Sequence, residues 1–234
     1  YWGVFRGTLL FGSEPKALMQ HPLFSGEIDL PSLQAYFAND CVPTPRSIWK
    51  HVHKLPPASY LVWKDGQTTE SVFWRPRFTE CSMSFPEAVR ELGQLVEESV
   101  RKRLISDVPL GVFLSGGIDS TTVAYFAQKN SSRPIETFSI AFEEKSFDES
   151  SYANMAAKVL GTSHHEQVFT AKHLPDLMPQ VFDLLDEPMA DPSILPTCLL
   201  SSFTKKSVTV ALGGDGADEL FAGYPTFQAD RFAG

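Results

Sequence analysis

The sequence predicts an α/β domain with a mostly parallel sheet, preceded by a smaller part that is rich in short strands. Three observations predict this arrangement. From residue 84 onward, short apolar stretches alternate with longer segments of helical period. Before residue 79, short strands, glycine turns and prolines prevail. A polar stretch separates the two parts, so we place the domains at residues 1–78 and 84–234.

The sequence of the first part predicts two hairpins and two short helices. Alternating apolar residues indicate strands, and Asp65-Gly66 is a typical two-residue hairpin turn. The prolines between residues 42 and 57 favour extended or turned chain. The expected elements are hairpins over residues 4–12 and 60–67 and helices near residues 14–20 and 30–39.

The second part predicts one long helix and then strands in alternation with helices. Ser84 and Glu87 have the spacing of a capping box. The apolar stripe that follows is Val89, Leu92, Val96, Val100 and Leu104. The expected strands cover residues 108–114, 136–142, 165–169 and 207–212, and the expected helices lie near residues 121–129, 149–160, 174–185 and 194–205. In such a sheet, ligands bind beyond the carboxyl ends of the strands.

The segment Ser115-Gly-Gly-Ile-Asp-Ser120, directly after the first of these strands, is the strongest functional signal. A strand that ends in Ser-Gly-Gly and continues as a helix predicts a pocket for nucleotide phosphates. The glycines allow backbone amides to approach an anion, and the helix N-terminus favours negative charge. The two serine hydroxyls are expected to add further donors. The alternative is an ordinary glycine-rich connection between a strand and a helix.

This loop differs from a Walker A loop, because no lysine follows its glycines. Asp119 would repel a triphosphate unless a cation lay between them, so we expect Mg²⁺ at this position. Binding of the β- and γ-phosphates would leave the α-phosphorus open to attack, with pyrophosphate as the leaving group. The loop therefore favours adenylation chemistry.

A second glycine-rich and acidic segment follows the last expected strand. We expect Asp218 to share the magnesium ion with Asp119. Asp215 is expected to face the acyl acceptor or its amine nucleophile, and the backbone of Gly213 and Gly214 is expected to approach the nucleotide. The alternative is a glycine turn whose aspartates cap a helix.

Composition and charge argue against several other classes of protein. The formal net charge of −8 argues against a nucleic-acid surface. There is neither an apolar stretch of membrane-spanning length nor a signal-peptide pattern at the start. Cys41, Cys81 and Cys198 form no CxxC motif and are interpreted as free thiols of a reducing compartment. We expect a cytoplasmic protein that binds neither nucleic acid nor membrane.

The chain resembles glutamine-dependent asparagine synthetases over almost its whole length. The segments that carry the resemblance are residues 108–120, 137–142, 160–166, 186–193 and 211–224 in the second part, and residues 10–18, 42–46 and 54–60 in the first. The resemblance implies an adenine-nucleotide α-hydrolase-like (PP-loop) fold for residues 84–234. It implies the C-terminal, β-rich part of an N-terminal-nucleophile glutaminase domain for residues 1–78.

The resemblance also implies a reaction, a cofactor and a set of site residues. ATP adenylates the side-chain carboxylate of aspartate and releases pyrophosphate, and glutamine-derived ammonia then displaces AMP to give asparagine. Pyrophosphate and Mg²⁺ are implied at Ser115, Gly116, Gly117, Asp119 and Ser120, and nucleotide contacts at Leu114 and Ile140. Contacts to ATP and the acyl-adenylate are implied at Gly213 and Gly214, adenylate formation at Asp215 and metal binding at Asp218. The sequence leaves a homodimer open.

The chain departs from the family pattern at several points. Nothing corresponds to the N-terminal cysteine nucleophile of the glutaminase, and the later lysine and tyrosine region of the synthetase is missing. Gly213 stands where serine is common. Tyr1 opens directly into an expected strand, and residues 230–234 end in a helical pattern. We therefore expect a fragment that is inactive alone.

Three other functions stay open at this point. Tailoring enzymes that close lactams or amidate other carboxylates use the same adenylation. Thiolation and sulfur-transfer enzymes share the Ser-Gly-Gly-x-Asp-Ser loop, although the acidic balance and the second acidic segment weigh against them. A decayed relative that only binds or scaffolds is the non-catalytic alternative.

Two further groups of residues have a simpler interpretation than a functional site. Adjacent strand residues point to opposite faces, so His164-His165-Glu166 is expected to be an ordinary strand end facing the cleft rather than a metal site. A turn around Pro188 and Pro192 is preferred over an acceptor site for the acids near it, which are Asp183, Asp186, Glu187 and Asp191.

Overall fold

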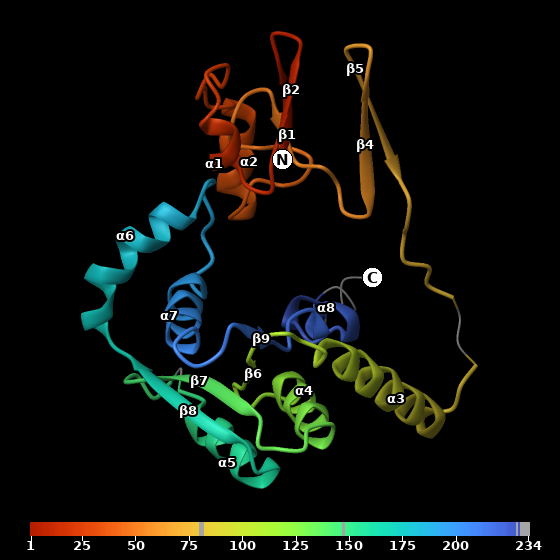
Figure 1. The fold of residues 1–234 in the computed structure, drawn as a ribbon, viewed down its shortest axis with the longest axis vertical. Coiled ribbons are helices and arrows are strands. Elements are labelled where there is room, and N and C mark those ends of the chain that lie inside the picture. Colours follow the sequence, from red (N-terminus) through yellow and green to blue (C-terminus); the bar gives the residue numbers. More distant parts are fainter. Residues whose placement is uncertain (80–81, 147, 228, 230–234) are drawn as a thin grey trace. The chain divides into compact units, whose positions relative to one another are not determined.

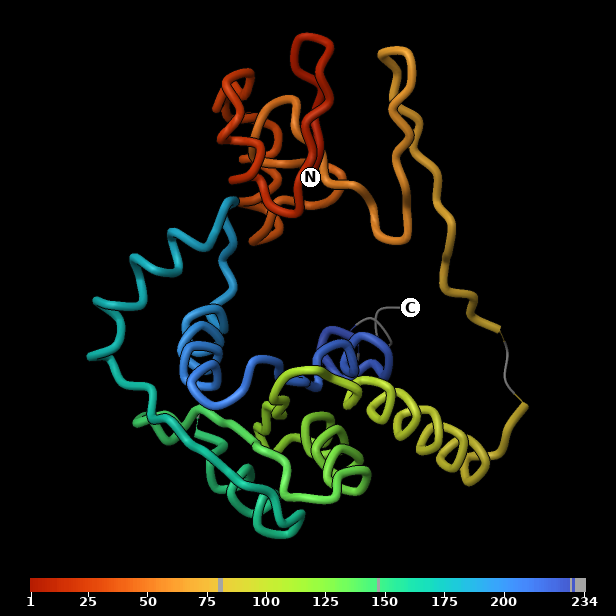
Figure 2. The backbone as a smooth tube through the Cα atoms, in the orientation of Figure 1, coloured from red at the N-terminus to blue at the C-terminus, as the bar shows by residue number. Residues whose placement is uncertain are grey.

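The computed structural model describes residues 1–79, 82–146, 148–227 and 229, and the expected helical end at residues 230–234 lies outside this range, as does Cys81. The chain divides into two compact units. The N-terminal unit comprises residues 1–81 and 178–194, and the sheet unit comprises residues 82–177 and 195–234. Residues 178–194, which follow the first three strands of the sheet unit in sequence, therefore pack with the N-terminal unit (Figure 2). No local pattern in the sequence indicates this return.

The N-terminal unit contains the two predicted hairpins and the two predicted helices (Figure 1). A three-stranded antiparallel sheet has the order β2-β1-β3, and β4 pairs with β5. The bounds are β1 (Trp2–Phe5), β2 (Thr8–Phe11), β3 (Val52–His53), β4 (Ser59–Lys64), β5 (Gln67–Val72), α1 (Pro15–Met19) and α2 (Leu30–Asn39). Asp65 and Gly66 have φ values of 51° and 78°, as a two-residue hairpin turn requires.

The sheet unit confirms the predicted α/β fold with a parallel sheet. Four parallel strands lie in the order β8-β7-β6-β9 (Figure 1). They are β6 (Leu110–Phe113), β7 (Glu136–Phe142), β8 (Ser163–Phe169) and β9 (Val210–Leu212). The helices in this part of the sequence are α3 (Phe85–Arg103), α4 (Ile118–Lys129), α5 (Ser150–Leu160), α6 (Leu174–Leu184), α7 (Ile194–Thr204) and α8 (Ala217–Phe221). From residue 178 onward, α6 belongs to the N-terminal unit.

Strand β9 is shorter than predicted because α7 ends in an additional turn. The N–H groups of Ser207 and Val208 both donate to the carbonyl of Thr204, so these residues close the helix instead of joining the sheet. Strand pairing begins where the N–H groups of Thr209 and Val210 donate to the carbonyl of Pro109.

The strand order places a topological switch point between β6 and β9. From β6 the chain proceeds outward to β7 and β8, and β9 then adds to the other side of β6. In open α/β sheets, ligands bind where the strand order reverses, beyond the carboxyl ends of the strands. Both glycine-rich segments singled out in the sequence start at this point.

The core of the sheet unit joins α3, α4 and α5 to the central strand. Val112 and Leu114 from β6 and its end pack with Val100 of α3, together with alanines of α4 and α5. The predicted apolar stripe of α3 is buried at Val100, which is 5% exposed, and partly buried at Val96 and Leu104, whereas Val89 is 53% exposed. No helix among the described residues is long and apolar enough to cross a lipid bilayer.

Candidate active site

The loop after β6 is shaped by Gly116. Its φ is +85°, a left-handed conformation that side chains rarely adopt. A Cβ at this position would lie 2.5 Å from the backbone nitrogen of Ala153 and 2.6 Å from the carbonyl carbon of Tyr152. The loop therefore passes directly over the backbone of α5, and only glycine fits there.

The two serines of the loop bond to each other and to the loop backbone. Their hydroxyl oxygens are 2.9 Å apart. The Ser115 N–H donates to Ser120 Oγ and the Gly117 N–H donates to Ser115 Oγ, each over 3.2 Å. In this structure the hydroxyls hold the turn closed, a structural role that was not expected from the sequence.

The start of α4 presents backbone N–H groups toward the same place. Gly117 is the N-cap in extended conformation, and no side chain caps the helix. The first N–H groups of a helix have no partner within the helix and attract anions. Asp119 lies in this first turn, so a carboxylate stands beside a site that favours negative ligands.

The segment after β9 lies against the start of α4. A Cβ on Gly214 would lie 2.8 Å from the Ser120 nitrogen and 3.1 Å from the Asp119 Cβ. The carboxylate of Asp215 occupies the space where a side chain at Gly213 would begin. The glycines thus allow the two acidic segments to meet at the switch point.

A cavity of about 510 Å³ lies where these segments meet. It is lined by every residue that we predicted for the site except Gly116, namely Leu114, Ser115, Gly117, Asp119, Ser120, Ile140, Gly213, Gly214, Asp215 and Asp218. Gly116 instead contacts the backbone of α5. The structure therefore brings the predicted residues together, and their individual roles stay predictions.

Several lining residues were missed in the sequence. They come from β7, the start of α5, the first turns of α7 and the segment around α8, namely Phe138, Ser139, Phe142, Glu149, Ser150, Ala153, Pro196, Thr197, Leu200, Gly216, Glu219 and Tyr224. The Tyr224 hydroxyl donates to Glu219 over 2.9 Å, and this hydrogen bond raises the pKa of Tyr224. The rule that ligands bind at carboxyl ends could have indicated Phe142, but no sequence signal marks α7.

Two of the predicted carboxylates line the same cavity, which the expected Mg²⁺ site requires. Asp119 and Asp218 both line the cavity. Among the described residues, no group of three or more histidine, cysteine or acidic side chains is arranged to hold a metal ion. Two carboxylates completed by phosphate oxygens and water form a donor set that Mg²⁺ prefers.

The expectation that the His164 and His165 strand end faces the cleft is wrong. Both residues lie at the amino end of β8, and neither lines the cavity at the carboxyl ends. The His164 ring bonds to the hydroxyls of Thr137 and Ser139, whereas His165 bonds to Glu136. The two side chains take separate partners, as the alternation of a strand requires.

The parallel sheet, its switch point and the cavity define the sheet unit as an α/β domain with a glycine-rich loop at the carboxyl ends of its strands. Sequence models match the asparagine synthase family over residues 91–233 and the glutamine amidotransferase domain over residues 1–74. The chain belongs to the asparagine synthase family, which confirms the resemblance found in the sequence.

Individual relatives agree with this assignment. The chain is 35% identical over 231 residues to asparagine synthetase [glutamine-hydrolyzing] 1 of Bacillus subtilis, and covers 36% of it with 97% of its own length. It is 32% identical to a putative asparagine synthetase of Methanocaldococcus jannaschii, covering 44% of that protein with 97% of its own length. The chain thus spans less than half of these relatives. An NMN synthetase from Francisella tularensis overlaps 61% of this chain and 59% of its own, with 18% identity and a TM-score of 0.40, too low to define a shared fold.

Proposed function

We propose that this chain takes part in ATP-dependent formation of asparagine in the cytoplasm. An oxygen of the aspartate side-chain carboxylate attacks the α-phosphorus of ATP, and the bond from that phosphorus to pyrophosphate breaks. Glutamine-derived ammonia then attacks the acyl carbon, the bond to AMP breaks, and the nitrogen loses a proton. The small-molecule partners are ATP, aspartate and ammonia.

The single observation that carries this proposal is the shared cavity at the switch point. It combines the uncapped N-terminus of α4, the closed serine loop and the carboxylates of Asp119 and Asp218. Donors at a helix N-terminus suit the β- and γ-phosphates. Bound there with Asp119 and Asp218, Mg²⁺ would neutralise the triphosphate charge and favour departure of pyrophosphate.

Other residues of the chain would orient the two reactants. Leu114 and Ile140 line the cavity at the ends of neighbouring strands and would contact the nucleoside. The Asp215 carboxylate lies beside Gly213, just after β9, where it would face the acceptor during adenylate formation. The glycines at 213 and 214 leave room for the reacting atoms beside the backbone.

Exchange of labelled pyrophosphate into ATP tests the proposal in the full-length protein. With aspartate and Mg²⁺ present, we expect exchange in the wild type and a loss of roughly 100-fold or more in Asp119→Asn. The matched control is Asp107→Asn, because Asp107 is an exposed aspartate that lines a separate cavity of the sheet unit. Normal exchange in the Asp119 variant would refute the assignment.

The acceptor is tested separately by AMP release with a panel of amino-acid carboxylates. We expect aspartate to give the highest kcat/KM. Preference for another carboxylate would instead assign the chain to the tailoring enzymes that share this adenylation.

A further inference from the structure

Two nearly buried carboxylates attach residues 183–189 to the rest of the N-terminal unit. The side chains of Asp186 and Glu187 are 10% and 9% exposed. Their partners come from residues 1–54, so the contacts join segments that are more than 130 residues apart in sequence. We call these two residues the acidic pair.

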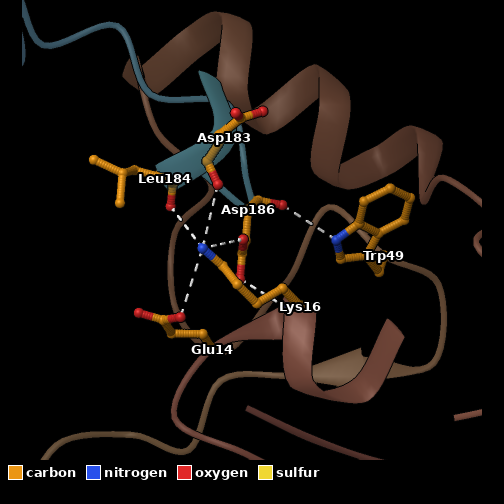
Figure 3. A network of polar contacts seen from close by, with 6 residues as sticks. All are labelled: Glu14, Lys16, Trp49, Asp183, Leu184 and Asp186. Atoms are coloured by element: carbon orange, nitrogen blue, oxygen red, sulfur yellow. Dashed lines mark hydrogen bonds and ion pairs between the residues drawn. The ribbon is translucent and has the colours of Figure 1, made fainter. Parts of the chain in front are cut away.

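The Asp186 carboxylate binds both the side-chain ammonium and the backbone N–H of Lys16 (Figure 3). One carboxylate oxygen lies 3.1 Å from Lys16 Nζ, and the other accepts the Lys16 N–H over 2.7 Å. The Lys16 ammonium also donates to the carbonyl of Leu184 at the end of α6, and the Trp49 indole donates to the Asp186 carbonyl. The hydrogen bond to Asp186 raises the pKa of Lys16, which favours the charged ammonium.

Glu187 makes an equivalent set of contacts. One oxygen accepts the Ile48 N–H over 2.7 Å, and the other lies 2.6 Å from Lys54 Nζ. The Tyr1 hydroxyl donates to the same oxygen over 3.2 Å. Burial, assisted by the charge of Glu187, raises the pKa of Tyr1 to about 12. Each member of the acidic pair thus accepts one backbone N–H and one lysine.

Backbone pairing continues the attachment beyond the acidic pair. Cys41 and Met189 form an antiparallel bridge, and the Ala190 N–H donates to the Asp40 carbonyl over 2.8 Å. Residues 186, 187, 189 and 190 therefore each have a defined partner among residues 1–54.

Stability alone is a weak explanation for this arrangement. Removing two carboxylates from water is costly, and apolar residues of similar volume often stabilise a fold as well or better. A carboxylate that accepts a particular backbone N–H group also fixes the position of its own segment relative to that group. The chain then continues into α7, which begins at Ile194 and contributes Pro196 and Thr197 to the cavity.

We infer that Asp186 and Glu187 are positioning residues that couple the supply of glutamine nitrogen to amide formation. They hold the segment before α7 in one register on the glutaminase-like unit, so that α7 transmits the state of this unit to the cavity wall. This inference rests on the proposed function and adds to it a link between the two half-reactions.

The test compares ammonia and glutamine as nitrogen sources in the full-length enzyme. For Asp186→Asn and Glu187→Gln we expect ammonia-dependent AMP formation within about twofold of the wild type. Glutamine-dependent AMP formation falls by roughly 5- to 150-fold, the usual range of coupling between sites. Glutamate released per AMP formed rises accordingly.

The matched control is Glu14→Gln. Glu14 is 64% exposed and lies 3.6 Å from the same Lys16 nitrogen, but no hydrogen bond or ion pair in the structure joins its side chain to residues 183–189. We expect its glutamate-to-AMP ratio to equal that of the wild type. If an acidic-pair variant does not fold, Lys16→Met is tested in its place. The Lys16 side chain is 38% exposed, and the hydrogen bond from the backbone N–H of residue 16 to the Asp186 carboxylate remains in this variant.

The possible outcomes separate this inference from the proposed function. The coupling role is overturned if the Asp186 and Glu187 variants release as much glutamate per AMP as the wild type. It is also overturned if they lose AMP formation equally with ammonia and with glutamine. In both cases the proposed function still stands, because the wild type remains active. A wild type that forms no AMP from ATP, aspartate and ammonia overturns the proposed function and the coupling role with it.

Discussion

Gly116 shows how one backbone conformation determines the shape of the loop after β6. Its positive φ and its close approach to the α5 backbone both exclude a side chain. We expect Gly116→Ala to lower the free energy of unfolding by about 2 kcal/mol or more, since the φ strain alone costs about 1–2 kcal/mol. ATP affinity should fall as well, because the loop must move. Urea unfolding and calorimetric titration with ATP measure the two effects.

Gly161→Ala is the matched control for this substitution. Gly161 has a φ of +71° at the end of α5, but a Cβ there would have no neighbour within 4 Å. We expect about 1–2 kcal/mol of destabilisation from strain and unchanged ATP affinity. Equal ATP affinities in the two variants would contradict the role given to Gly116.

His164 makes the stability of the sheet unit depend on pH. Burial between Thr137 and Ser139 is the largest cause that lowers the pKa of His164 below 6.5, and Glu166 opposes it in part. The unfolded chain therefore binds the proton first as the pH falls below about 6.5, and the fold loses stability there. We expect His164→Gln to flatten this loss between pH 7.5 and 5.5, measured by urea unfolding.

The glutamine variant keeps a polar group that can bond to the two hydroxyls, so the pH dependence is the informative readout. His51→Gln replaces an exposed histidine of the N-terminal unit and serves as the control. A slope in His164→Gln that matches the wild type would contradict the assignment.

At the scale of elements, α3 is buried along only part of its apolar stripe. Val100 packs against β6 and α4, whereas Val89 is exposed. We expect Val100→Ala to lower the free energy of unfolding by about 2 kcal/mol, because two buried carbon groups are removed. Val89→Ala should change it by less than about 0.5 kcal/mol. Equal effects of the two substitutions in urea unfolding would show that the stripe is buried along its whole length.

The sequence predicts most elements because their signals are local. The bounds of α2 and β7 agree with the predicted ranges to the residue. The capping box at Ser84 is confirmed by the hydrogen bonds that its N–H and hydroxyl donate to Glu87. The length of β9 was predicted wrongly, because the last turn of α7 takes over residues whose composition suits a strand.

At the scale of the whole molecule, contacts between distant segments are what the sequence does not reveal. The site could be predicted because glycine-rich acidic segments end two strands, and parallel strands place such ends at one edge. The return of residues 178–194 to the N-terminal unit could not be predicted, because the lysines that pair with Asp186 and Glu187 are far away in the sequence. The lining residues of α7 were missed for the same reason.

A crystal structure of the full-length protein with Mg²⁺ and a non-hydrolysable ATP analogue tests the central claim most directly. We expect the β- and γ-phosphates on the Ser115–Ser120 loop and the metal ion bound by Asp119 and Asp218. A triphosphate bound in the separate cavity lined by Arg133 and His165, or a metal ion that touches neither aspartate, would contradict the account.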